Sequence, residues 1–102
     1  METGWIKIHR KLLDWEWADD PNMVALFIHL LLNANFYESK WRGITIPKGA
    51  FFTTQTKLCS KTGLSRSTLR TCIDRLKATG EIATQTFNNG TVVIIRNYEK
   101  YQ

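Results

Sequence analysis

Apolar residues recur at helical spacing from Pro21 onward, directly after the acidic pair Asp19-Asp20. Asp20 stands at an N-cap position and Pro21 at the first helical position, and both are typical of a helix start. One stripe of this helix carries Met23, Leu26, Phe27, Leu30 and Leu31. Three more apolar residues extend around most of its circumference, namely Val24, Ile28 and Leu32. A small core does not cover such a helix fully, so the pattern also predicts a homodimer through the Met23 to Leu32 helix.

Alternation of apolar and polar residues predicts extended structure in three places. Gly4 to Arg10 places Ile6 and Ile8 on one face, as in a short half-buried strand. Residues 44–53 form two extended pieces around Pro47-Lys48-Gly49. Residues 81–87 and 91–97 flank Asn88-Asn89-Gly90, and Asn-Gly between two β-rich segments is a strong hairpin signal.

Two further helices are predicted between residues 54 and 79, with a tight break at Gly63-Leu64-Ser65. Leu58 and the small Cys59 face inward on the first of them, and Leu64 fills the corner. The inward stripe of the second helix holds Leu69, Cys72, Ile73 and Leu76. Gly80 ends this helix at a left-handed position. The spacing is typical of a helix-turn-helix.

The order of these elements predicts an α+β fold of the winged helix-turn-helix type, with a three-helix core, a β-hairpin wing and short N-terminal strands. The 102 residues fit one DNA-binding domain. Within it, residues 1–53 hold an N-terminal strand, a helix and a hairpin and serve dimerisation, residues 54–79 form the helix-turn-helix, and residues 81–97 form the wing.

Positive charge is concentrated in the second half of the chain. Residues 1–47 hold 5 Lys/Arg and 6 Asp/Glu, a net charge of −1, whereas residues 48–102 hold 9 and 3, a net charge of +6. This asymmetry predicts a negatively charged partner. Double-stranded DNA is favoured over a membrane, because the longest apolar run is far shorter than the ~20 residues that a membrane span requires.

The outward side of the second helix of the helix-turn-helix supplies the candidate DNA-recognition residues. A step of about 100° per residue places polar side chains opposite the Leu69 and Leu76 stripe, where they fit a major groove. Arg70 can form a forked pair with guanine. The candidates are Ser65, Arg66, Ser67, Arg70, Thr71 and Asp74. An ordinary solvated helix face is the alternative.

Cations in the first turns of both helices indicate phosphate binding. Helix N-termini repel cations by about 0.3 to 1 kcal/mol each, yet Lys57 and Arg66 occupy these turns with no acidic residue beside them. A phosphate group relieves both penalties. The candidate phosphate contacts are Thr54, Gln55, Lys57, Lys61, Arg75 and Lys77, and the candidate wing contacts are Asn88, Asn89 and Thr91. The alternative for the wing is a purely structural hairpin.

Other classes of function find no matching pattern in the sequence. The two histidines and two cysteines share no zinc-ligand spacing, so we expect no metal or other cofactor. A Gly-rich phosphate loop, a GxSxG motif and a catalytic carboxylate pair are all missing, so we expect no enzyme. The tryptophans lie outside the basic half, which disfavours single-strand stacking. The lack of a secretion signal predicts a cytoplasmic location, without a membrane partner.

Four segments cover nearly the whole chain: GWIKIHRKLLDWEW, WRGITIPKGAFFTT, TQTKLCSKTGLSRSTLRTCIDRLKATGEI and IIRNYEKYQ. Together they resemble the N-terminal domain of phage and prophage replication initiators of the DnaD-like replisome organiser family. The resemblance implies recognition of origin or primosomal DNA, self-association, and other replisome proteins as partners. It also implies that Ser65 to Lys77 is the recognition helix and Glu81 to Asn97 the wing. In that family a C-terminal region recruits helicase machinery, so we expect DNA recognition alone from residues 1–102.

Two other functions stay open at this point. A transcription regulator would use the same fold on a promoter, and the two helices hold no residue specific to replication. A protein-interaction module of the replisome would instead oligomerise through the apolar helix and bind DNA weakly. The DNA target and its half-site spacing are not encoded in residue types.

Overall fold

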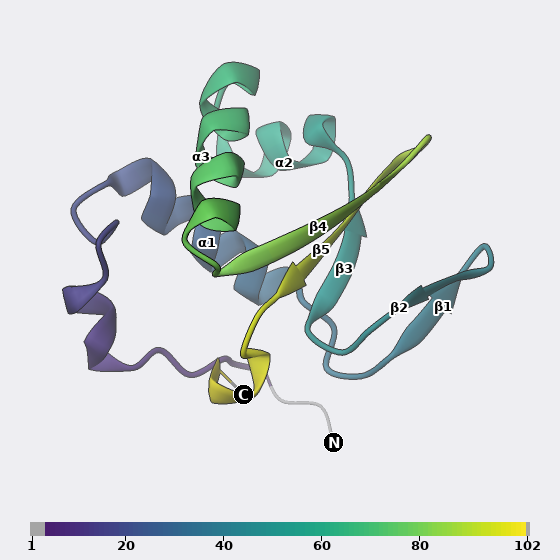
Figure 1. Ribbon diagram of the computed structural model, residues 1–102, viewed down its shortest axis with the longest axis horizontal. Coiled ribbons are helices and arrows are strands. Elements are labelled where there is room, and N and C mark those ends of the chain that lie inside the picture. Colours follow the sequence, from purple (N-terminus) through teal and green to yellow (C-terminus); the bar gives the residue numbers. More distant parts are fainter. Residues whose placement is uncertain (1–3, 102) are drawn as a thin grey trace.

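In the computed structural model, which describes residues 4–101, the chain forms an α+β fold with three α-helices and two small antiparallel sheets (Figure 1). The helices are α1 (Pro21–Asn33), α2 (Gln55–Thr62) and α3 (Arg66–Ala78), with short 3-10 helices η1 (Arg10–Asp14) and η2 (Tyr98–Tyr101). The strands are β1 (Ser39–Trp41), β2 (Ile44–Ile46), β3 (Ala50–Thr53), β4 (Ile82–Phe87) and β5 (Gly90–Ile95). The predicted α+β class is therefore confirmed.

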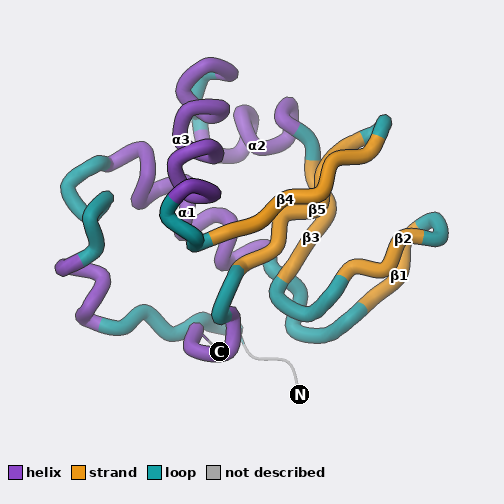
Figure 2. Tube along the Cα trace, in the orientation of Figure 1, coloured by secondary structure: helices purple, strands orange, loops and turns teal. Residues whose placement is uncertain are grey.

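The larger sheet has the strand order β3-β5-β4, and β1 and β2 form a hairpin of their own (Figure 2). In the β4–β5 hairpin Phe87 pairs with Gly90, so the connection is Asn88-Asn89. In the β1–β2 hairpin Trp41 pairs with Ile44 across Arg42-Gly43. Both turn residues of this second hairpin have positive φ, +50° and +78°, which is the geometry of a type I′ turn.

Each face of the three-stranded sheet buries a separate apolar cluster, because successive side chains along a strand point to opposite faces. One face packs against the helices through Phe51, Ile82, Val93 and Ile95. The other face is covered by the β1–β2 hairpin, with a cluster that contains Ile44, Ile46, Ala50, Phe52 and Val92. The hairpin is therefore packed onto the back of the sheet.

The helix boundaries follow local capping chemistry. Asp20 accepts hydrogen bonds from the backbone N–H groups of Asn22 and Met23 at the start of α1. Thr54 caps α2 and Ser65 caps α3 in the same way. The left-handed Gly63 (φ +77°) ends α2 and allows the tight turn into α3. After α3, the Glu81 N–H bonds to the Leu76 carbonyl with Gly80 at φ +84°, a Schellman ending. These predicted starts and ends are confirmed.

The chain itself covers most of the apolar surface of α1. Its predicted stripe is fully buried, and Val24 and Ile28 are half-buried. Leu32 is the apolar residue of this helix that stays open, with 61% of its surface exposed. The expected homodimer through residues 23–32 stays a prediction, but the unpaired apolar surface that motivated it is small.

One expectation for the first 53 residues is wrong, and another needs refinement. Residues 4–9 form no strand, and Arg10 begins η1. A strand needs a neighbouring edge to pair with, whereas this segment bonds through the Lys7 N–H to the Tyr101 carbonyl of η2 and through the His9 carbonyl to the Leu12 N–H of η1. The two extended pieces predicted in residues 44–53 are confirmed as β2 and β3, and they belong to different sheets. The hairpin uses Ser39–Trp41 instead, a strand that alternation over so few residues did not predict.

Candidate functional site

A groove of about 260 Å³ lies between α3, the β4–β5 hairpin and the start of α2. Six of the sequence-predicted residues line it: Thr54, Gln55, Arg70, Asp74, Lys77 and Thr91. They come from three elements that the fold brings together. The bottom of the groove is apolar, with Leu58, Leu69, Ile73 and Val93 among its lining residues.

Two polar residues of β4 that line the groove were missed by the sequence reasoning. Thr84 and Thr86 project from β4 into the groove beside Thr91 of β5. They share a face with the buried Ile82 because side chains alternate along the strand. The sequence signal for this face is the alternation of Thr84 and Thr86 along a predicted strand, in line with Ile82.

The other predicted residues lie outside the lining of the groove. Ser67 and Thr71 are exposed on the outer side of α3, where the Thr71 hydroxyl donates to the Ser67 carbonyl (3.1 Å). Arg66 reaches back to the Thr56 hydroxyl of α2 (3.4 Å). Asn88 and Asn89 are exposed at the tip of the β4–β5 hairpin, which extends away from the helices (Figure 1).

Most cations of the helix-turn-helix carry exposed charge without a carboxylate partner. Within residues 4–101 the ion pair between Arg75 and Asp20 is the only one. Arg70 and Lys77 flank Asp74 at helical spacing in the groove, yet neither forms an ion pair with it. Lys57 lies in the first turn of α2 and Lys61 in its last turn, and both are exposed. The groove and the adjacent helix surface are therefore positively charged.

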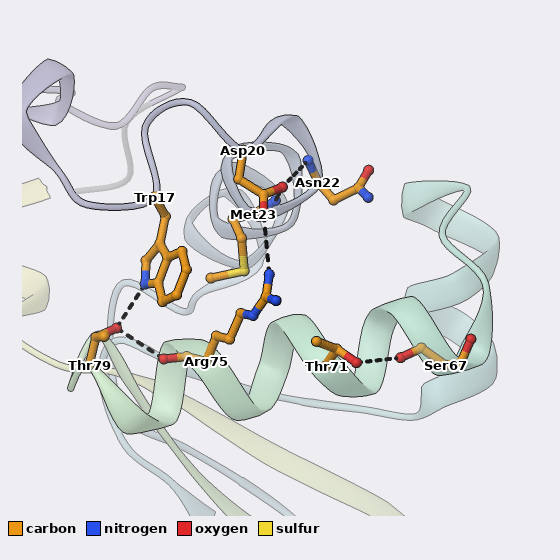
Figure 3. A network of polar contacts seen from close by, with 8 residues as sticks. All are labelled: Trp17, Asp20, Asn22, Met23, Ser67, Thr71, Arg75 and Thr79. Carbon is orange, nitrogen blue, oxygen red and sulfur yellow. Dashed lines mark hydrogen bonds and ion pairs between the residues drawn. The ribbon is translucent and has the colours of Figure 1, made fainter.

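Arg75 differs from the other cations because it joins α3 to α1 (Figure 3). Its Nη1 lies 3.3 Å from Oδ2 of Asp20, the N-cap residue of α1, and its guanidinium lies 5.3 Å from the centre of the Trp17 ring. The Trp17 indole N–H donates to the Thr79 hydroxyl at the end of α3 (3.1 Å). This network fixes the orientation of α3 relative to α1, on the opposite flank of α3 from the groove.

The cysteines lie on the inward sides of α2 and α3, as expected, and both are free thiols. Burial raises the pKa of the Cys72 thiol, the nearby Asp20 carboxylate adds to this effect, and Arg75 opposes it. Cys72 is therefore a protonated packing residue at neutral pH. A raised pKa is the reverse of what a reactive thiolate needs.

A second cavity, of about 640 Å³, lies between the N-terminal segment and η2. Its lining combines apolar side chains such as Leu12, Phe27 and Tyr101 with both positive and negative groups. The charges of this cavity are mixed, unlike those of the groove, and the predicted site residues do not line it.

Comparisons of the chain with protein-family models, curated proteins and solved structures found no match. Among the described residues, no helix combines the length and apolar character needed to cross a membrane. No group of three or more His, Cys, Asp or Glu side chains in this part of the chain is arranged to hold a metal ion.

Proposed function

We propose that this chain is a winged helix-turn-helix domain that binds double-stranded DNA, with the outer side of α3 in the major groove. In this proposal α2 and α3 form the helix-turn-helix and the β4–β5 hairpin is the wing. The dimensions of an α-helix suit the major groove, and a hairpin beside it reaches the flanking backbone.

One observation carries the proposal. Arg70 and Lys77 are exposed on α3, have no ion-pair partner within residues 4–101, and line a groove beside the β4–β5 hairpin. Arg70 and Lys77 stand two helical turns apart with one carboxylate, Asp74, between them, so this stretch of α3 carries a net positive charge. Phosphate groups compensate such a charge, which supports DNA as the partner.

The helix starts support the same partner. Neither α2 nor α3 has an acidic residue in its first turn, whereas Lys57 and Arg66 add positive charge there. Thr54 and Ser65 already cap these turns as neutral residues. A negative partner is therefore the remaining source of favourable charge at both helix starts.

The residues divide into different roles in this proposal. Arg70 reads guanine through a forked pair, and Ser67 and Thr71 contact neighbouring bases or the backbone. Lys57, Lys61 and Lys77 contact phosphates, and Asn88 and Asn89 contact the flanking backbone. Arg75, which the sequence assigned to phosphate, instead holds α3 in position through Asp20 and Trp17.

The resemblance to phage and prophage replication initiators supports a narrower role as the DNA-recognition domain of such a protein. The well-covered α1 favours this role over an oligomerisation module, because Leu32 is the one large apolar side chain of that helix that is exposed. A transcription regulator would use the same surface.

The test compares two variants that remove the same charges at different places. Arg70→Ala/Lys77→Ala removes one Arg and one Lys from the groove, and Arg10→Ala/Lys7→Ala removes one of each from the N-terminal segment. Fluorescence anisotropy with a 20-bp duplex at several salt concentrations measures both. Each lost phosphate contact makes the negative slope of log affinity against log salt shallower by about 0.9. The slope of the groove variant is therefore expected to be shallower by about 0.9 to 1.8, and its affinity for the duplex at least tenfold lower.

The control variant is expected to stay within about threefold of the unchanged protein, as for loss of diffuse charge alone. Equal weakening by both variants would mean that α3 has no special part in binding. A wild-type chain with no duplex affinity near the ordinary non-specific range of about 10⁻⁴ to 10⁻⁶ M would overturn the proposal altogether.

A further inference from the structure

The β1–β2 hairpin is a short arm on the back of the sheet that the proposed function does not use. Figure 1 shows this arm projecting from the body toward the same side of the view as the tip of the β4–β5 hairpin. Its strands pair in register, Ser39 with Ile46, Lys40 with Thr45 and Trp41 with Ile44.

The arm is held firmly against the sheet on its inner face. The Trp41 ring lies 4.7 Å from the ring of Phe52, centre to centre, and Ile46 is buried against Ala50 and Val92. Such aromatic and aliphatic packing gives the arm one defined position. A preformed arm loses little entropy when it binds a partner.

Positive charge covers the outer side and the tip of the arm. Lys40, Arg42 and the nearby Lys48 are exposed, and residues 39–54 contain no Asp or Glu. None of these cations forms an ion pair within the described residues. The guanidinium of Arg42 lies 4.9 Å from the centre of the Trp41 ring, so this charge is held at the tip.

The arginine at the tip of the arm is unfavourable for the conformation of the turn. Arg42 occupies a left-handed position, φ +50°, where Asn, Asp or Gly is favoured in a type I′ turn. A non-glycine residue in such a position costs about 1 kcal/mol or more and persists where another requirement retains it. Binding of a negatively charged partner by Arg42 would explain why an arginine occupies this exposed but unfavourable position.

We infer that the β1–β2 arm is a second DNA-contacting element, in which Lys40 and Arg42 bind phosphates of the duplex. This inference rests on the proposed function and adds a contact made by neither α3 nor the β4–β5 hairpin. Thr45, paired with Lys40 on the exposed side of the arm, lies within the same contact.

The loss variant is Lys40→Gln/Arg42→Asn, in which asparagine suits the left-handed position and keeps the turn intact. Its unfolding temperature is expected to stay equal to or above that of the unchanged protein. With the 20-bp duplex, the negative slope of log affinity against log salt is expected to become shallower by about 0.9 to 1.8. The matched control is Lys7→Gln/Arg10→Asn, which removes one Lys and one Arg elsewhere and leaves the slope unchanged.

The gain variant is Thr45→Lys, which adds a cation opposite Lys40. It steepens the slope by about 0.9, whereas Asn33→Lys at the exposed end of α1 does not. Arm variants that match their controls, in an assay where Arg70→Ala/Lys77→Ala still weakens binding, overturn the arm contact and leave the proposed function standing. The arm contact would also be overturned if the arm variants weakened binding to anionic lipid vesicles and left binding to the duplex unchanged.

Discussion

At the scale of single residues, Gly90 shows how the sheet constrains the tip of the β4–β5 hairpin. Its φ is +155°, and a Cβ built there would lie 2.6 Å from the Thr53 carbonyl oxygen and 2.5 Å from the Phe52 ring. Gly63 also has a positive φ, +77°, but a Cβ there would meet nothing within 4 Å. An alanine at position 63 therefore meets backbone strain alone, whereas an alanine at position 90 meets backbone strain and a steric clash.

We expect Gly90→Ala to lower the free energy of unfolding by about 2 to 4 kcal/mol, because strain and overpacking each cost about 1 to 3 kcal/mol. Gly63→Ala is expected to cost only the strain, about 1 kcal/mol. Urea denaturation measures both. Equal losses for the two variants would show that the close approach of β3 to Gly90 does not restrict the side chain.

The same scale shows what residue types could predict of the site. Capping residues and left-handed glycines are local chemistry, so Asp20 and Gly80 were predicted at the positions that the structure gives them. The partner of Arg75 could not be predicted, since Asp20 is separated from it by 55 residues and the contact depends on how α1 crosses α3. Residue type alone made Arg75 an exposed cation available to phosphate.

At the scale of elements, the contact between α1 and α3 determines where the groove lies. Asp20 has two tasks in this contact, because its Oδ1 caps α1 and its Oδ2 pairs with Arg75. The side chains of the pair are 45% and 29% exposed, for Arg75 and Asp20 respectively, so the ion pair itself contributes little. The cap is the larger contribution.

Substitution of Asp20 separates these two tasks. Asp20→Asn keeps a good N-cap and removes the charge, so thermal denaturation is expected to show a loss of under about 1 kcal/mol. Asp20→Ala removes both and is expected to cost about 1 to 2 kcal/mol. If asparagine were as damaging as alanine, the ion pair rather than the cap would hold this corner of the fold.

Prediction of elements succeeded where the pattern was long and failed where it was short. The thirteen residues of α1 and of α3 present several turns of regular spacing. Strands β1 and β2 have three residues each, too few for alternation to define them. Residues 4–10 alternate as a strand does but have no sheet edge to join, and that information lies in tertiary structure.

At the scale of the whole molecule, the charge asymmetry of the sequence becomes a spatial one. Among the described acidic residues of the first half, Asp14, Glu16, Asp19 and Asp20 lie in η1 or between it and α1, and Glu38 precedes the β1–β2 arm. Unpaired cations lie on α2, α3 and this arm. The sequence could predict the existence of a basic surface. It could not predict that Lys40 and Arg42, in the net acidic half, extend that surface from the back of the sheet.

The most direct measurement of the central claim is an NMR titration of the isotope-labelled chain with a 20-bp duplex. The account predicts that amide shifts concentrate at Ser67, Arg70, Thr71 and Lys77 of α3 and at the starts of α2 and α3, and weaken as salt is raised. Shifts confined to η1 and α1, or no shifts at a duplex concentration of about 1 mM, well above the usual non-specific dissociation constants, would contradict it.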